Sequence, residues 1–372
     1  MGRGTSAYSA AFLIGTPSSR SLWHCKPDSC KIKRRSEATA SLVLDREGDR
    51  LAQQPNTAYG GQAVIEGVMF AGRHVNVTAV RRKNQEIAFY EVPRGSTPNI
   101  VKWLKKIPFI RGLVGIVESS AKGSQHLNFS AEAYAEDEST PEEAAKAKEK
   151  EKWSLSMILG VAVVGVLSFV FGKVIFAAVP AFLESEIFGR AFDNKFLHNI
   201  LEGVIKIALL LFYLWMISKT PIIKRLFQYH GAEHKVISAY EAGDELTVEN
   251  VQRASRLHYR CGSSFIIFTV IVGVILYSFP IFHWDSVWER IWIRIALLPV
   301  VIGISYEVLK WTNAVRDIPV LRFLGYPGLW LQLLTTKEPN DEQVAVSIAS
   351  FNRMMELDRE YSRQPAAATV SA

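Results

Sequence analysis

Two long apolar runs without a charged residue constrain the fold of this 372-residue chain more than any other feature. Residues 153–171 read WSLSMILGVAVVGVLSFVF, and residues 265–282 are also uncharged throughout. A helix of about 18 to 20 apolar residues can cross the roughly 30 Å hydrocarbon layer of a bilayer, and it exceeds what the core helix of a soluble protein needs. Both runs therefore predict transmembrane helices.

Two further apolar blocks, residues 201–217 and 292–309, each hold two charged residues. If Lys206 and Glu307 lie at any depth in a membrane, they must snorkel to its surface or face the interior of a helix bundle. The overall composition, 49% hydrophobic with a mean hydropathy of +0.10, looks ordinary only because the apolar residues are concentrated in these four blocks. We expect a mainly α integral membrane protein with about four spans within residues 153–309.

The distribution of basic residues predicts the orientation of these spans. The segment between the second and third spans holds seven Lys and Arg residues, and the segment between the first and second holds three. The positive-inside rule then places both termini and the long motif loop, residues 218–263, on the same side of the membrane.

The first 58 residues have the composition of a targeting segment. They are rich in Ser, Arg and Lys and contain a single acidic residue, Asp28, in the first 36 positions. We interpret them as an organelle transit peptide, and the alternative is a disordered basic tail of a bacterial protein. Cys25 and Cys30 would be lost on import. Cys261 would then have no partner for an internal disulfide, which fits a reducing compartment and leaves metal ligation or burial as its role.

Residues 59–130 predict a small α/β domain. Alternation around Lys83 indicates a β-hairpin, and the following stretch indicates a basic amphipathic helix suited to a membrane interface or to packing on the hairpin. The preceding segment GGQAVIEGVMFAG indicates tight turns or close backbone approach, and it carries Glu66, a possible extra metal ligand. Residues 131–152 predict a charged helical tether.

The motif loop predicts a helical hairpin. Its second short helix is expected to begin at Thr247, which has Glu and Asn residues in the following turn. Glu241 and Glu249 are further acidic candidates for a contact with a metal site. The sequence of residues 310–357 predicts an interfacial tail with a final capped helix. We expect residues 358–372 to form a disordered end.

The residues of the motif loop that carry chemistry are three imidazoles, a carboxylate and a thiol. His230 and His234 are four apart and share one face of a helix, with Glu233 between them, in the H-x-x-E-H order of inverted zinc peptidases. His258 and Cys261 follow in a loop that can fold back, with the short spacing found in many zinc sites. The alternative is that these groups are solvated or contact lipid headgroups.

Four separated segments resemble the YqhQ-like family of membrane proteins, which is found in bacteria and in eukaryotes with plastids. They are GGQAVIEGVMFAG, YHGAEHK, RLHYRCGSSF and PGLWLQLLTTKEPND, within a resemblance that covers roughly residues 60–357. The resemblance implies a predicted metal-dependent membrane enzyme of unknown reaction. For a plastid-type member, the resemblance also implies that the protein lies in a chloroplast membrane. The alternative is a bacterial plasma membrane.

The chain departs from the family pattern at four positions. Tyr259 and Ser263 stand where the family turn has Pro and Thr, which loosens the turn that would aim His258 and Cys261. In the glycine-rich segment, Phe70 and Ala71 stand where a second Met and an Arg are usual, so the loss of that Arg argues against a role in binding an anionic substrate.

These observations lead to a preferred function and two alternatives. The preferred one is a metal-dependent hydrolase in which His230, His234 and either His258 or Cys261 hold a divalent transition metal such as zinc, while Glu233 activates water. The expected partners are the lipid bilayer and a lipid or membrane-protein substrate, with no nucleic acid. The first alternative is a membrane assembly or scaffold factor with a closed structural metal site. The second is a transporter, which would use the buried charges of the spans. Metal identity, reaction and oligomeric state stay open.

Overall fold

The computed structural model describes residues 59–139 and 172–363, apart from residues 96, 173, 174, 177, 280 and 283. Four predictions lie largely or wholly outside these residues. They concern the leader, the greater part of the charged tether, the span at residues 153–171 and residues 364–372 of the predicted disordered end. The prediction of disorder was wrong for residues 358–363, which continue the last helix. The described part confirms a mainly helical protein with a small antiparallel sheet near its N-terminus.

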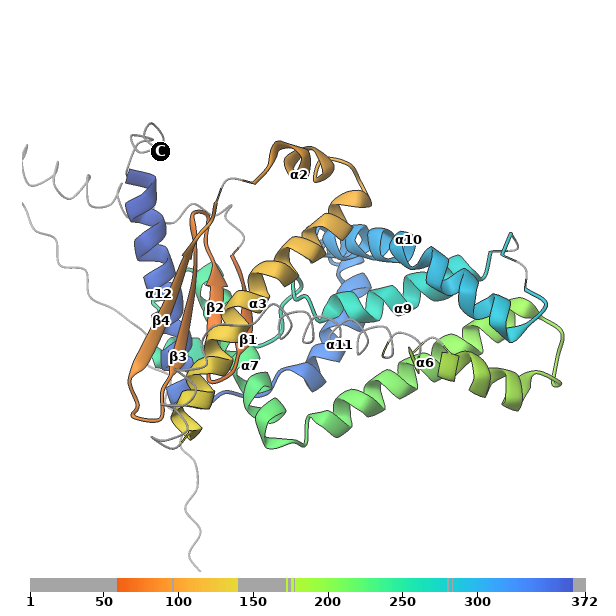
Figure 1. The fold of residues 1–372 in the computed structure, drawn as a ribbon, viewed down its shortest axis with the longest axis horizontal. Helices are drawn as coiled ribbons and strands as arrows, with labels where there is room; N and C mark the ends of the chain where they lie inside the picture. Colours follow the sequence, from red (N-terminus) through yellow and green to blue (C-terminus); the bar gives the residue numbers. More distant parts are fainter. Residues whose placement is uncertain are drawn as a thin grey trace, which may run out of the picture. The chain divides into compact units, whose positions relative to one another are not determined.

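The sheet is a four-stranded antiparallel meander in which each strand pairs with the next (Figure 1). The strands are β1 (Gly60–Val64), β2 (Gly67–Ala71), β3 (Val75–Arg81) and β4 (Ile87–Pro93). The β3–β4 pair confirms the predicted hairpin. The glycine-rich segment forms a second hairpin, β1–β2, whose turn places Glu66 at a φ of 55°. The sequence analysis did not anticipate these two strands.

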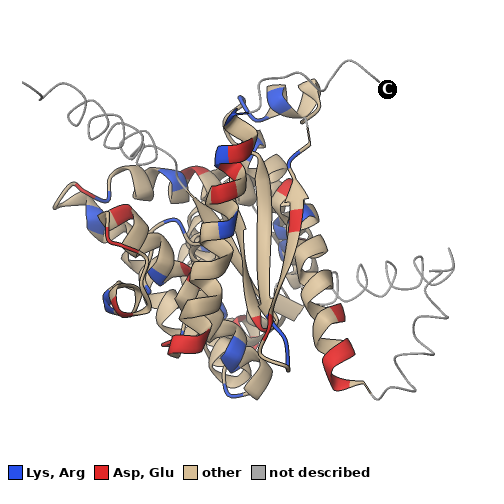
Figure 2. Ribbon diagram, turned by 90° about the vertical axis from the view of Figure 1, so that its left-hand side faces the viewer, with Lys and Arg blue, Asp and Glu red and all other residues tan. Residues whose placement is uncertain are grey.

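Helices cover both faces of the sheet. Alternate residues of β3 point to opposite sides, so each side can be followed from its own set of side chains. Val77 and Ala79 belong to a core shared with α7 (Pro221–Ala242) and α12 (Asp341–Arg363). On the other face Val80 packs with residues of α3 (Ile110–Glu138), and Thr78 lies 2.6 Å from the ring of His126. Figure 2, turned toward the sheet, shows helices on both of its sides with charged residues along them. The sheet is therefore the middle layer of a three-layer unit.

The last described helix, α12, completes the core of the first strands. Its N-terminus has the predicted cap, in which Asn340 and Gln343 exchange hydrogen bonds between side chain and backbone. Phe351 is fully buried, with its ring 5.1 Å from that of Phe70 in β2. Further along, the Asp358 carboxylate accepts hydrogen bonds from three successive backbone N–H groups at residues 73–75. The predicted interfacial tail thus holds a helix that forms part of the sheet's own core.

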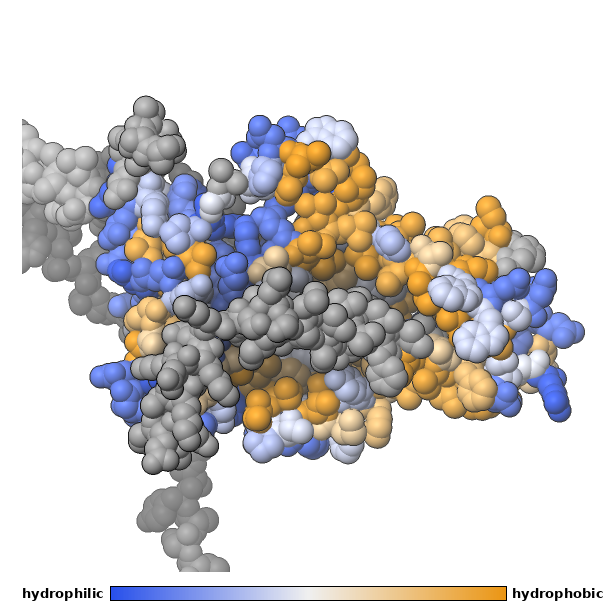
Figure 3. Space-filling view, viewed as in Figure 1, coloured by the Kyte–Doolittle hydropathy of each residue, from blue (hydrophilic) through white to orange (hydrophobic). Residues whose placement is uncertain are grey.

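The three apolar blocks that lie among the described residues form packed helices, α6 (Lys195–Ile217), α9 (Ser264–Tyr277) and α10 (Val287–Ala314). The later helix α11 (Tyr326–Thr335) packs against α6 and α9 and completes this bundle. Among the described helices, α6 and α10 are long and apolar enough to cross a membrane, whereas α9 has 14 residues and is shorter than the predicted span. Hydrophobic residues gather over this bundle and over the start of α3, and hydrophilic residues gather at the sheet (Figure 3).

The predicted amphipathic stretch is divided into two helices. The short α2 (Asn99–Leu104) ends before Pro108, and α3 begins after Phe109, whose φ of 66° turns the chain sharply. Arg111 at the start of α3 forms an ion pair with Glu307 of α10. This contact ties the sheet unit to the bundle.

Candidate metal centre

Three of the residues singled out in the sequence converge. His230 and His234 lie one turn apart on α7, with ring centres 4.5 Å apart, and Cys261 reaches them from the turn that precedes α9. One ligand atom from each of the three lies within 4.8 Å of the other two. His234 and Cys261 are buried, and His230 is partly buried. One metal ion could contact all three side chains.

Main-chain carbonyl groups fix the orientation of both imidazoles. The Nδ1 atom of His230 lies 2.8 Å from the carbonyl oxygen of Thr335, and Nδ1 of His234 lies 2.7 Å from that of Arg256. A carbonyl oxygen only accepts, so each Nδ1 must carry the proton. In the neutral ring the lone pair is then on Nε2, which is the usual arrangement for a histidine that binds a metal.

The thiol of Cys261 contacts these rings, and the contact changes the pKa of both groups. Its Sγ lies 3.2 Å from Nε2 of His230 and 3.0 Å from the hydroxyl of Ser263. Burial by itself would raise the pKa of the thiol, but hydrogen bonds from His230 and His234 hold it well below its usual value. Burial would likewise lower the pKa of His230, yet the contact with Cys261 raises it to about 9. These opposite shifts favour an imidazolium beside a thiolate, and the thiolate is the form that binds metals.

Glu233 is buried beside this group, between α7 and β1. Its carboxylate accepts a hydrogen bond from the backbone N–H of Gly61. A Cβ atom on Gly61 would lie 3.0 Å from the Glu233 side chain and 2.5 Å from the carbonyl oxygen of Met69, so this approach requires glycine. Burial raises the pKa of Glu233, and the nearby His230 and His234 oppose that rise.

The structure places His258 next to the cluster but not in it. Its ring centre is 5.9 Å from that of His234, its Nδ1 accepts from the backbone N–H of Arg260, and its Nε2 lies 3.5 Å from a carboxylate oxygen of Glu241. Glu241 also pairs with the Arg260 guanidinium. Of the two candidates for a third ligand, Cys261 lies close to both His230 and His234 in this structure, and His258 lies beside them against Glu241.

The other acidic candidates are engaged elsewhere. Glu66 forms an ion pair with Arg225 and accepts from the hydroxyl of Tyr229. Glu249 pairs with Arg253 on the surface. Neither belongs to the group formed by the two histidines and the cysteine.

Residues that sequence reasoning missed hold the turn of Cys261 in place. The fully buried Gln332 of α11 accepts from the backbone N–H of His258 and donates to the carbonyl oxygen of His258 and to the hydroxyl of Ser264. The ring of Tyr259 packs so closely on Gly325 that a Cβ atom there would lie 2.5 Å from it. Ser263, despite being smaller than the family's Thr, keeps a hydroxyl beside the thiol.

A profile of proteins of unknown function (DUF1385) matches residues 107–357, which include all the residues of this cluster. The chain belongs to the DUF1385 family. A relative named "Uncharacterized protein YqhQ", from Bacillus subtilis (strain 168), is 55% identical over 301 residues, which cover 81% of this chain and 93% of the relative. This likeness confirms the YqhQ-like resemblance. No solved structure matches the chain.

The donor set of this DUF1385 protein fits a borderline-soft divalent metal. Two neutral imidazole nitrogens and a thiolate are the ligands that zinc prefers, and carboxylate-binding ions such as Mg²⁺ would find no oxygen donor among the three. Both histidines have the outer hydrogen bonds typical of metal ligands.

Proposed function

We propose that this protein is a metal-dependent enzyme whose ion is held by His230, His234 and Cys261. The observation that supports it best is the pair of carbonyl contacts at Thr335 and Arg256, which direct the Nε2 atoms of both rings, the atoms that would bind the ion, to the side of the thiol. Such hydrogen bonds from Nδ1 are typical of histidines that bind a metal through Nε2. Zinc is the first candidate for the ion.

Hydrolysis is the reaction that this arrangement favours. A zinc ion with three protein ligands keeps one position open and supplies Lewis-acid activation of water or of a carbonyl group. Glu233 would accept and return the proton, because burial raises the pKa of its carboxyl group above the usual value and makes it a stronger base. The Gly61 N–H orients that carboxylate.

The surroundings of the centre support a substrate from the membrane. The loop carrying Cys261 leads directly into apolar α9, and α6 and α10 are suited to spanning a bilayer. Large apolar side chains on α6 and α10 are exposed, among them Trp215, Trp288 and Trp292. With the span predicted at residues 153–171, and with the shorter α9 as a further span, these helices would give the four-span architecture. A lipid or a membrane-protein segment is then the substrate class.

The cellular membrane is part of the same proposal. The composition of residues 1–58 favours import into a plastid, with the chloroplast membrane as the destination. The similarity to a Bacillus subtilis protein is compatible with the bacterial plasma membrane.

A closed structural site in an assembly factor is the second candidate function. The observation that favours it is the distance of 5.9 Å between the rings of His258 and His234. If His258 turned away from Glu241, it would provide a fourth protein ligand and leave no position for a substrate.

Bound metal, measured by elemental mass spectrometry on the full chain purified in mild detergent without a histidine tag, tests the centre. We expect about one zinc or similar ion per chain in the parent and little in His234→Ala or Cys261→Ser, because each substitution removes one of three ligands. A metal-free parent would exclude the proposal.

Glu233→Gln separates the two functions. The enzyme should keep its metal and lose turnover of membrane lipids or peptides in a vesicle assay by a factor of about 100 or more, as expected for loss of a general base. A variant with unchanged metal and unchanged cellular phenotype would support the scaffold instead.

A further inference from the structure

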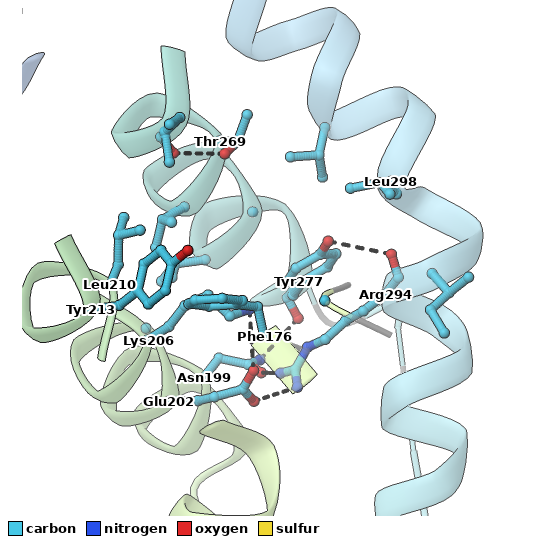
Figure 4. Close-up of a pocket in the computed structure, with 18 of the residues that line it drawn as sticks. Phe176, Asn199, Glu202, Lys206, Leu210, Tyr213, Thr269, Tyr277, Arg294 and Leu298 are labelled. Atoms are coloured by element: carbon cyan, nitrogen blue, oxygen red, sulfur yellow. Dashed lines mark hydrogen bonds and ion pairs between the residues drawn. The ribbon is translucent and has the colours of Figure 1, made fainter. Parts of the chain in front are cut away.

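The helical bundle contains a second candidate site, in a cavity of about 490 Å³ between α6, α9 and α10. Figure 4 shows its two kinds of lining. Apolar side chains such as Leu210, Val270 and Leu298 form most of the wall, and a group of polar side chains that includes Lys206 and Arg294 forms one end. The volume is in the usual range for a ligand pocket.

The polar end has a surplus of positive charge. The Glu202 carboxylate is paired with the guanidinium groups of Arg290 and Arg294, and Arg290 also pairs with Glu184. Two carboxylates thus match two guanidinium groups. The ammonium group of Lys206, 3.6 Å from Glu202, shares that carboxylate with the two guanidinium groups, so three cations surround two carboxylates.

Hydrogen-bond donors are also left over at this end. Arg294 is only 5% exposed, and its Nε atom has no hydrogen-bond partner among the described residues. A buried donor without an acceptor destabilises the protein unless a ligand or water supplies one. Lys206 and Arg294, which line the cavity, offer donors only, and the surplus of one cation over the carboxylates favours an anionic acceptor as the ligand.

The location of this polar end, together with the apolar wall beside it, also restricts the kind of ligand. Lys206 is eleven residues from each end of α6, which places it about 16 Å from either terminus of that helix. A small ion would leave the apolar wall between Leu210 and Val270 uncovered, whereas a hydrocarbon chain would cover it.

We propose that this cavity binds an anionic single-chain amphiphile, such as a fatty acid, with its head at Lys206 and Arg294 and its chain along α6 and α9. The charge of the head would neutralise Lys206, and the chain would fill the apolar part. The site is separate from the metal centre and does not depend on it. It gives this protein a means of taking one lipid molecule out of the bilayer.

Native mass spectrometry of the full chain in mild detergent tests the proposal with oleate, oleyl alcohol and oleylamine, which share one chain. We expect one oleate per protein, and binding of the alcohol and the amine at least about tenfold weaker, since a charge-assisted contact is lost. Oleoyl lysophosphatidic acid, titrated in parallel, distinguishes a phosphate head from a carboxylate head.

Three variants test whether oleate binds in this cavity. Lys206→Met should weaken oleate binding about tenfold while keeping the length of the side chain. Val270→Phe should fill the apolar part and exclude the chain, and Ile275→Phe, an exposed position on the same helix, is its matched control. Size-exclusion profile and bound metal report whether each variant is folded.

Two results would overturn the proposal. One is oleyl alcohol binding as tightly as oleate, because the head charge would then not be recognised. The other is unchanged oleate binding in folded Lys206→Met. Neither result bears on the metal centre, whose test is metal content.

Discussion

The imidazole of His230 donates its Nδ1–H to the carbonyl oxygen of Thr335, 105 residues further along the chain and 2.8 Å away. This bond joins α7 to the end of α11. It turns Nε2 of His230 toward Cys261. The geometry of the cluster therefore depends on how closely the segment after α11 lies against α7.

Gly231 permits that close contact and gives the first prediction. A Cβ atom at Gly231 would lie 2.1 Å from the carbonyl oxygen of Lys337. Gly231→Ala should push this segment away, reduce bound metal and lower stability by about 1–3 kcal/mol. Gly262→Ala, next to Cys261 but with open space around it, is the control. Alanine normally favours a helix, so a stabilised, fully metallated Gly231→Ala protein would contradict this explanation.

The protonation state of His230 gives a prediction on pH. The contact with Cys261 raises the pKa of His230 to about 9, so Nε2 carries a proton at pH 7.5 when no metal is bound. A metal can bind only after that proton leaves. Apparent zinc affinity should thus rise with pH up to about pH 9. Titration calorimetry in buffers of different ionisation enthalpy should detect about one proton released for each zinc ion bound. Zinc binding without any release of protons would refute the prediction.

His258 and His234 should differ in their effect on metal content. His258 lies against Glu241 and Arg260, whereas His234 faces the thiol group. We expect His258→Ala to retain nearly all the metal of the parent, and His234→Ala to lose most of it, in elemental analysis of matched preparations. Equal loss in both variants would indicate a four-ligand structural site.

Asp358 should be essential for the sheet. Its carboxylate accepts from the backbone N–H groups of Arg73, His74 and Val75, and Asp358→Ala would leave them without that acceptor. We expect a loss of about 2–4 kcal/mol, seen as a lower melting temperature and faster proteolysis at the β2–β3 turn. Glu356→Ala, which removes an exposed ion pair on the same helix, should change stability by less than about 1 kcal/mol. Similar melting of the two variants would show that Asp358 is not an anchor.

The features that could be predicted from the sequence are local ones. The spacing of His230 and His234 predicts a shared helical face, and alternation around Lys83 predicts the β3–β4 hairpin, because both patterns follow from the geometry of a single element. In β1 and β2 the glycines weaken the alternation, so those strands were not anticipated.

The features that could not be predicted depend on distant contacts. The spacing of His258 and Cys261 places both near α7, but it does not tell which one the turn aims inward. That choice is made by Gln332, which binds both backbone groups of His258 from 74 residues away. No short-range pattern marks Gln332 as the partner, nor α12 as the cover of the sheet.

The distance along the chain between the sheet and α12 has a consequence for synthesis. About 283 residues separate Val75 from Asp358, and a ribosome that adds about 5 to 20 residues per second needs roughly 15 to 60 seconds to make them. During that time Phe70 and Val77 lack the part of their cover that α12 supplies, and, among the described helices, only α7 can pack on that face of the sheet. The sheet core therefore cannot close completely until the last helix has been made, so α12 is the final piece of this layer to be added.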